Sequence, residues 1–121
     1  MRYIVLLYLE NSRWIKIGKL GRFYFKEGYY LYVGSGGKNP EKRVERHKKK
    51  KKKKRWHIDC LTEFTEFVKV WWFKEGEEEI ARKLAERFEI PVKGFGSSDK
   101  KSPSHLFYAG VKINSESFKP L

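Results

Sequence analysis

Cysteine is nearly absent from this 121-residue chain, in which Cys60 stands alone. A single cysteine excludes an internal disulfide and a zinc site built from several cysteines. The apolar residues around Cys60 predict a small buried core residue rather than a reactive thiol. Because the chain does not depend on disulfides, we expect it to be cytoplasmic.

Long apolar runs are missing as well. No stretch approaches the roughly 20 apolar residues of a membrane-spanning helix. Met1 and Arg2 lead directly into a strand-like run without the pattern of a cleavable signal. We therefore expect no membrane association, and we expect residues 1–121 to form a single domain large enough to bury a core.

Acidic residues are scarce where basic residues gather. The chain has 28 Lys and Arg against 15 Asp and Glu, a net charge of +13. Residues 38–57 alone hold 12 basic and two acidic residues, net +10, with a lysine-rich segment at 48–54. Such concentrated charge favours a polyanionic partner, which we expect to be nucleic acid, DNA rather than RNA. The residues expected to contact it are Lys38, Lys42, Arg46, Lys48, Lys49, Lys50, Lys51, Lys52, Lys53, Lys54 and Arg55.

The rest of the chain is organised around residues 29–37, Tyr-Tyr-Leu-Tyr-Val-Gly-Ser-Gly-Gly. Side chains alternate along a strand, so Tyr30 and Tyr32 share one face while their neighbours lie on the other. We expect the neighbours to pack in the core and the two tyrosines to present hydroxyls at the edge of a loop. The glycines that follow allow a turn or a close approach of the backbone.

Other segments complete the predicted fold. Runs of strand length occur at 3–9, 14–17, 23–25, 67–73 and 105–108. The first third therefore predicts a β-meander or a pair of hairpins. Asn39-Pro40 opens one helix, and Gly76 precedes an amphipathic one. We expect the α/β (α+β) class, with a small central antiparallel sheet of three strands, or a slightly larger mixed sheet, flanked by helices.

Three positions could carry chemistry beside the tyrosines. Arg43 and His47 are four residues apart and project from the same helical face. Glu77 lies three and four residues before the first apolar residues of its helix, at the rim of the core. A carboxylate there is a plausible ligand for Mg²⁺ or Mn²⁺, which favour oxygen donors. Glu78 and Glu79 adjoin it, and a shift of one or two residues would change the ligand.

The order of these residues is similar to that of a known superfamily. The GIY-YIG nuclease pattern is resembled by Tyr3, Tyr32-Val33-Gly34, Arg43, His47 and Glu77. Its small stand-alone Uri-type branch is resembled by the blocks 28–35, 56–59, 94–99 and 104–108. Two departures are visible: Met1-Arg2-Tyr3 replaces a glycine-led triplet, and Lys100-Lys101-Ser102-Pro103 stands where that branch has cysteines.

The resemblance implies a small domain that cuts phosphodiester bonds with one divalent metal, Mg²⁺ or Mn²⁺. By that resemblance Tyr32, with Tyr3 nearby, would help deprotonate the attacking water. Arg43 would neutralise charge in the transition state, and Glu77 would hold the metal. His47 would take a position often filled by a tyrosine or a histidine. The implied activity is an endonuclease in the repair or processing of structured DNA, with a repair protein as a further partner.

A different class of function fits the same residues. The chain would then be a non-catalytic DNA- or RNA-binding module that uses segment 38–57, with aromatic strand surfaces stacking unpaired bases. On that hypothesis the three glutamates only favour the start of a helix. We interpret His57 and Asp59 as capping or packing residues. The presence of tyrosine, arginine and glutamate in one order favours the nuclease.

Overall fold

A four-stranded antiparallel sheet forms the centre of the protein, in the order β5-β1-β4-β6. The computed structural model describes residues 1–97 and 101–121. Ser98 and Asp99 of the predicted block 94–99, and Lys100 of the segment that departs from the branch, lie outside the described residues. The strands are β1 Arg2–Leu9, β4 Gly28–Ser35, β5 Thr65–Phe73 and β6 Leu106–Gly110. The expected α+β class is confirmed, and the sheet is antiparallel throughout.

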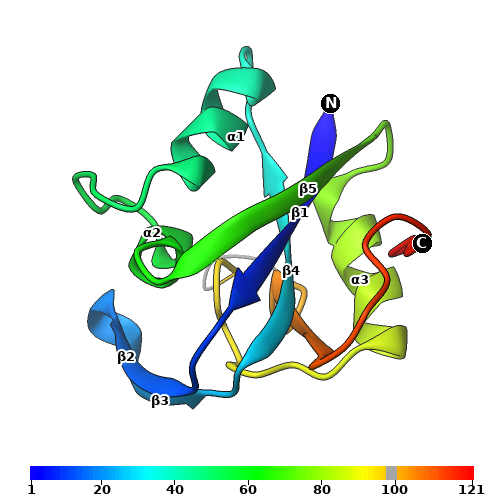
Figure 1. Cartoon of the computed structure of the whole chain (residues 1–121). Coiled ribbons are helices and arrows are strands. Elements are labelled where there is room, and N and C mark those ends of the chain that lie inside the picture. Colours follow the sequence, from blue (N-terminus) through cyan, green and yellow to red (C-terminus); the bar gives the residue numbers. More distant parts are fainter. Residues whose placement is uncertain (98–100) are drawn as a thin grey trace.

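Three α-helices cover the two faces of this sheet in the described part of the chain (Figure 1). They are α1 Pro40–Lys48, α2 His57–Thr62 and α3 Glu77–Arg87. α1 and α2 pack on one face, while α3 and the C-terminal segment pack on the other. None of the helices within the described residues is long and apolar enough to cross a bilayer.

The start of α1 is encoded locally. The Asn39 side chain accepts a hydrogen bond from the backbone N–H of Lys42, and Pro40 occupies the first helical position. The helix ends at Lys48, where the lysine run continues without helical structure. Like charges on successive turns repel one another, so the run does not extend the helix. Val44 and His47 are the buried residues of α1.

The predicted β-meander or pair of hairpins is wrong, because β1 and β4 pair with each other on either side of a single hairpin. β2 Arg13–Ile17 and β3 Gly21–Phe25 form a separate two-stranded sheet, joined by a short 3₁₀ turn at Gly18–Leu20. β1 pairs with β4 across this hairpin and with β5 on its other side, so both of its edges are occupied. The apolar face of the hairpin therefore packs beneath the sheet, among the core residues of the α1 and α2 side.

The expected exposure of Tyr30 and Tyr32 is also wrong. Tyr30 is buried and donates a hydrogen bond to the Lys26 carbonyl at 2.5 Å, while Tyr32 is 9% exposed. The alternation itself is confirmed, since Leu31 and Val33 join the core cluster on the opposite face. Both faces of β4 are covered, and Tyr32 lines a cleft at the end of this strand.

Candidate active site

An open cleft of about 590 Å³ lies at the end of β4. Residues from β4, α1, α2, α3 and the segment before β6 meet there, although they are far apart in the sequence. Its lining consists of Tyr32, Gly34, Ser35, Gly37, Arg43, Arg55, Trp56, His57, Glu77, Gly96 and His105. Three of the predicted catalytic residues, Tyr32, Arg43 and Glu77, thus come together in one cleft.

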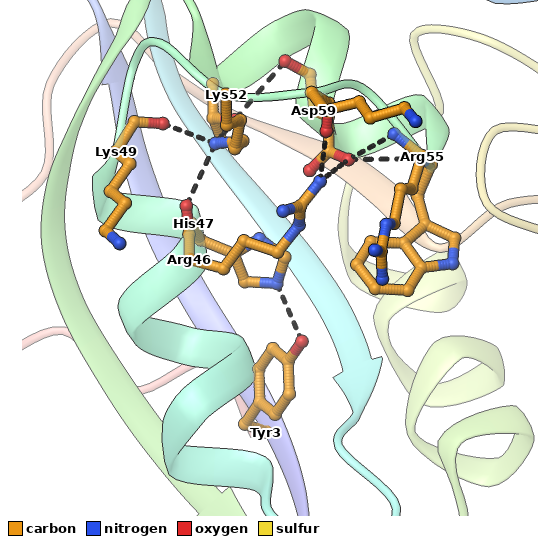
Figure 2. Close-up of polar contacts among 10 residues, drawn as sticks. Tyr3, Arg46, His47, Lys49, Lys52, Arg55 and Asp59 are labelled. Atoms are coloured by element: carbon orange, nitrogen blue, oxygen red, sulfur yellow. Dashed lines mark hydrogen bonds and ion pairs between the residues drawn. The ribbon is translucent and has the colours of Figure 1, made fainter.

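The other two predicted catalytic residues form a buried pair. The Tyr3 hydroxyl lies 2.7 Å from His47 Nε2, and both side chains are buried (Figure 2). Tyr3 pairs with Gly34 across the β1–β4 ladder, and a Cβ at Gly34 would lie only 2.4 Å from the Tyr3 hydroxyl. Glycine at this position therefore lets the Tyr3 ring lie over the end of β4.

His47 connects the buried pair to the cleft. Its ring centroid lies 5.6 Å from that of Tyr3 and 5.6 Å from that of Tyr32. Burial lowers the pKa of His47 to about 3, helped by the nearby positive charge of Lys52, so the imidazole is neutral at physiological pH. Burial raises the pKa of Tyr3, which keeps its proton. The contact is therefore a hydrogen bond between two neutral groups.

Two opposing charges act on Tyr32 in the cleft. Burial raises the pKa of Tyr32, so in the free protein it is a protonated phenol at neutral pH. Arg43 lowers that pKa and Glu77 raises it. Arg43 itself is fixed, because its guanidinium donates to the Ser35 carbonyl and lies 4.1 Å from the centre of the Trp56 ring.

Glu78 is committed to a structural role. Its carboxylate accepts hydrogen bonds from the backbone N–H groups of Lys101 at 2.8 Å and Ser102 at 3.3 Å, and lies 3.2 Å from His105 Nε2. Burial alone would raise the pKa of Glu78, but these hydrogen bonds lower it to about 2. Glu78 thus ties the start of α3 to the segment that leads into β6.

Of the three adjacent glutamates, Glu77 alone lines the cleft. Glu79 is exposed and lies 4.0 Å from Lys83 on the same helix. No group of three or more His, Cys, Asp or Glu able to hold a metal occurs among the described residues. One carboxylate in an open cleft still fits Mg²⁺, which binds through one or two carboxylates, substrate phosphates and waters.

Sequence reasoning underrated His57, which also lines the cleft. Its Nδ1 accepts a hydrogen bond from the Gly96 backbone N–H at 2.9 Å, so the proton of the neutral ring is on Nε2. Burial lowers the pKa of His57. The capping prediction is confirmed for Asp59, which accepts from the backbone N–H groups of Arg55 and Trp56 (Figure 2). The signal for His57 was its place at the end of the basic segment 38–57, in the block 56–59 that resembles the Uri-type branch.

A second, basic groove of about 860 Å³ adjoins the cleft. The two share Gly37, Arg43, Arg55 and Trp56 as lining residues. The remaining lining residues are Gly36, Lys38, Asn39, Lys42, Glu45, Arg46, Lys49, Lys51 and Lys52. Seven of the residues predicted to contact nucleic acid therefore line a groove that opens into the cleft: Lys38, Lys42, Arg46, Lys49, Lys51, Lys52 and Arg55.

The lysines of residues 48–54 differ in their contacts. Three of them form exposed ion pairs: Lys48 with Glu45, Lys50 with Glu66 and Lys54 with Glu63. Lys52 turns inward, and its ammonium donates to the carbonyls of Arg46 and Lys49 and to the Thr62 hydroxyl (Figure 2). Burial lowers the pKa of Lys52. This lysine holds the end of α1 against α2 rather than facing solvent.

The comparison with protein families gives one match, to a family described as "Domain of unknown function DUF123", over residues 2–119. The chain belongs to this family. The searches of curated proteins and of solved structures returned no match. The part of the chain that matches the DUF123 family contains every strand and helix described above, so the cleft and the basic groove both lie inside the family domain.

Proposed function

We propose that this protein is a metal-dependent endonuclease that hydrolyses phosphodiester bonds in DNA, in the repair or processing of structured DNA. One observation carries the proposal. Tyr32 from β4, Arg43 from α1 and Glu77 from α3 line a single cleft, and Tyr32 lies beside the His47 ring of the buried contact with Tyr3. The resemblance to the GIY-YIG nucleases, and to their Uri-type branch, supports the same residues in the same order.

Arg43 suits the stabilisation of a phosphoryl transition state. Attack on a phosphodiester spreads negative charge over the oxygens of the phosphoryl group, and catalysis depends on fixed positive charge beside them. The contacts of Arg43 with Ser35 and Trp56 hold the guanidinium at the cleft before any substrate binds. A preorganised donor of this kind needs no reorientation during the reaction.

Tyr32 would orient the attacking water, and it could accept the proton of that water once its own phenol proton has passed to solvent. Nearby positive charge favours the phenolate, and Arg43 already lowers the pKa of Tyr32 against the effect of burial. Glu77 would hold Mg²⁺ or Mn²⁺, and such an ion supplies positive charge that lowers the pKa of bound water. His47 stays neutral and fixes Tyr3 behind Tyr32, so neither adds a charge that would oppose the metal.

A cleavage assay with paired variants tests this proposal. Purified protein is mixed with labelled linear, nicked, single-stranded and branched DNA, and with RNA, in Mg²⁺, Mn²⁺ or chelator. Glu77→Gln should lower the rate about 10²–10³-fold, while Glu79→Gln, its exposed neighbour on the same helix, should not. Tyr32→Phe is paired in the same way with Tyr29→Phe, a change on the opposite face of β4.

The groove favours a second candidate, a nucleic-acid-binding module without catalysis. Eight cationic side chains and one carboxylate, Glu45, line the groove, and the cations other than the inward-turned Lys52 would bind phosphates even with an inert cleft. Tight, salt-sensitive binding without cleavage would support this candidate and contradict the nuclease. Cleavage that is equal in the wild type, Glu77→Gln and Tyr32→Phe would point to a contaminating enzyme and also contradict it.

A further inference from the structure

We infer that the outer face of the β2–β3 hairpin is a second binding surface, separate from the cleft and the basic groove, for a single-stranded segment of nucleic acid. Four side chains make up this surface, which we call the hairpin face: Trp14, Lys16, Arg22 and Tyr24. The inference does not require the cleft to be catalytic, because it concerns binding alone.

The distribution of charge singles out the hairpin. Residues 13–25 contain four basic residues and no acidic one, net +4. With net +10 in residues 38–57, the remainder of the chain carries net −1 of the total +13. All of the excess positive charge therefore lies in two segments, and one of them is this hairpin.

The register of the hairpin places two cations opposite each other. Lys16 pairs with Arg22 across the two strands, and both are exposed. Like charges at directly opposed positions destabilise a sheet, and neither side chain forms an ion pair with a described residue. An unfavourable arrangement of this kind is explained by an anionic partner that contacts both cations.

Two large aromatic residues lie beside these cations. Trp14 pairs with Tyr24 on the same face, with ring centroids 5.6 Å apart, and the two are 59% and 53% exposed. A shallow recess of about 320 Å³ is lined by Trp14 and Arg22. Exposed aromatic rings next to cations are the pattern by which proteins stack unpaired bases and hold the adjoining phosphates. A base pair inside a duplex does not expose its rings for such stacking.

The rest of the hairpin fixes this face outward. Ile15, Ile17 and Phe25 point the other way and are buried in the core beside α2. Arg13 lies with its guanidinium 3.7 Å from the centre of the Phe64 ring. Phe64 in turn lines a cavity of about 520 Å³ together with lysines of the 48–54 segment.

The hairpin and the lysine segment therefore lie on the same side of the molecule, with α2 and Phe64 between them (Figure 1). A strand leaving the basic groove could continue past Phe64 onto the hairpin face. This continuity favours nucleic acid as the occupant over a separate protein partner. It also predicts that the hairpin contributes more to the binding of long single strands than of short ones.

The experiment measures binding by fluorescence anisotropy of labelled single-stranded and blunt duplex DNA, in chelator so that no cleavage occurs. Lys16→Gln combined with Arg22→Gln should weaken single-strand binding about tenfold and reduce the salt slope by about one to two. Because it removes repulsion between like charges, the same double variant should melt at the wild-type temperature or higher. Weaker binding by an equally stable protein cannot come from misfolding.

Trp14→Ala combined with Tyr24→Ala separates stacking from charge. Loss of two stacking rings should weaken single-strand binding about tenfold or more while changing duplex binding less than threefold. Lys112→Gln with Lys119→Gln is the matched control, since it removes two exposed cations from the C-terminal segment on the opposite face of the sheet. This control should change single-strand binding less than twofold.

Three results would overturn the inference. The first is that both hairpin variants bind single-stranded DNA within twofold of the wild type. The second is that they lose no more binding than the control does. The third comes from binding to vesicles of anionic phospholipid. If the hairpin variants lose binding to vesicles but keep binding to single-stranded DNA, the face serves a membrane surface instead. None of these results bears on cleavage, so the inference and the proposed nuclease can fail separately.

Discussion

The two faces of the central sheet are built from the same strands but bury different chemistry. The face under α3 buries aliphatic and aromatic carbon: Ile4, Leu6, Leu31, Val33, Ile80, Ala81, Leu84 and Phe107. The face under α1 and α2 also buries phenols, and His47 and Asp59 lie there with almost no exposure. Buried polar groups cost free energy unless they are paired, so a face that carries them contributes less stability per residue. The face under α3 is therefore apolar throughout, whereas the other face combines a larger apolar cluster with the polar side chains at the cleft.

The largest effect should come from the apolar face. Leu31→Ala should lower the free energy of unfolding by about 2–5 kcal/mol, because Leu31 is fully buried and leaves a cavity. Tyr32→Phe, one residue further along β4, removes only a hydroxyl at the cleft and should cost less than about 1.5 kcal/mol. Urea denaturation of both variants measures the difference. Equal losses would mean that the two faces contribute alike.

The cleavage rate should respond in the reverse order, with a larger loss from a change at the cleft than from a change on the apolar face. In the cleavage assay Arg43→Ala should lower the rate about 10²–10³-fold, and Leu31→Ala should leave it near the wild-type value where the protein remains folded. Arg43→Lys keeps the charge but loses the planar guanidinium that stacks on Trp56, so we expect an intermediate rate. A rate for Arg43→Ala equal to that of the wild type would remove Arg43 from the proposed mechanism.

Acid should lower the free energy of unfolding through the buried His47 on the polar face. The folded protein keeps His47 neutral down to about pH 3, whereas the unfolded chain protonates it near pH 6.5. Below pH 6.5 the unfolded state therefore binds more protons, and the free energy of unfolding should fall as pH falls, by up to about 1.4 kcal/mol per pH unit. Denaturation curves between pH 7 and 5 test this, above the range in which Glu78 titrates.

Two variants test whether His47 causes the dependence of the free energy of unfolding on pH. His47→Gln should reduce this dependence. Leu31→Ala should lower the free energy of unfolding equally at every pH. His57, whose pKa is also lowered by burial, contributes in the same direction, so His57→Gln is measured in parallel. A slope that His47→Gln leaves unchanged would contradict the assignment to His47.

The smallest effects should arise in the lysine-rich segment. Changing Lys49, Lys51 and Lys53 to Gln together should reduce the slope of log K against log salt by about two to three. Changing Lys48, Lys50 and Lys54 together should reduce it less, because these lysines are paired with Glu45, Glu66 and Glu63. Binding titrations at several salt concentrations distinguish the two sets. Equal reductions would mean that the ion pairs open when nucleic acid binds.

Local patterns in the sequence predicted the elements well. The apolar runs of β1 and β5 and the amphipathic stripe of α3 each depend on residues close together in the chain. Asn39-Pro40 placed the start of α1 correctly for the same reason. The local patterns did not predict the pairing of β1 with β4, because a hairpin separates the strands and no local signal distinguishes a neighbour in sequence from a neighbour in the sheet.

The site was predicted only in part, since each part depends on contacts over long distances. The resemblance to the GIY-YIG pattern predicted Tyr32, Arg43 and Glu77, which the structure brings to one cleft, while their catalytic roles stay predictions. The hydrogen bonds of the Glu78 carboxylate are made with a segment more than 20 residues later in the chain. The inward turn of Lys52 depends on Thr62 in α2. A run of identical lysines offers no local signal that could distinguish this one.

Because residues 48–54 are all lysine, the length of this tract could change without loss of the contact that anchors it. Lys52 anchors the turn after α1, and identical residues flank it on both sides. If one lysine were gained or lost in the tract, the chain could slide by a residue and bring an equivalent ammonium to the same carbonyls. The contact that anchors the turn would therefore be kept when the length of the tract changes, and only the number of outward lysines would differ.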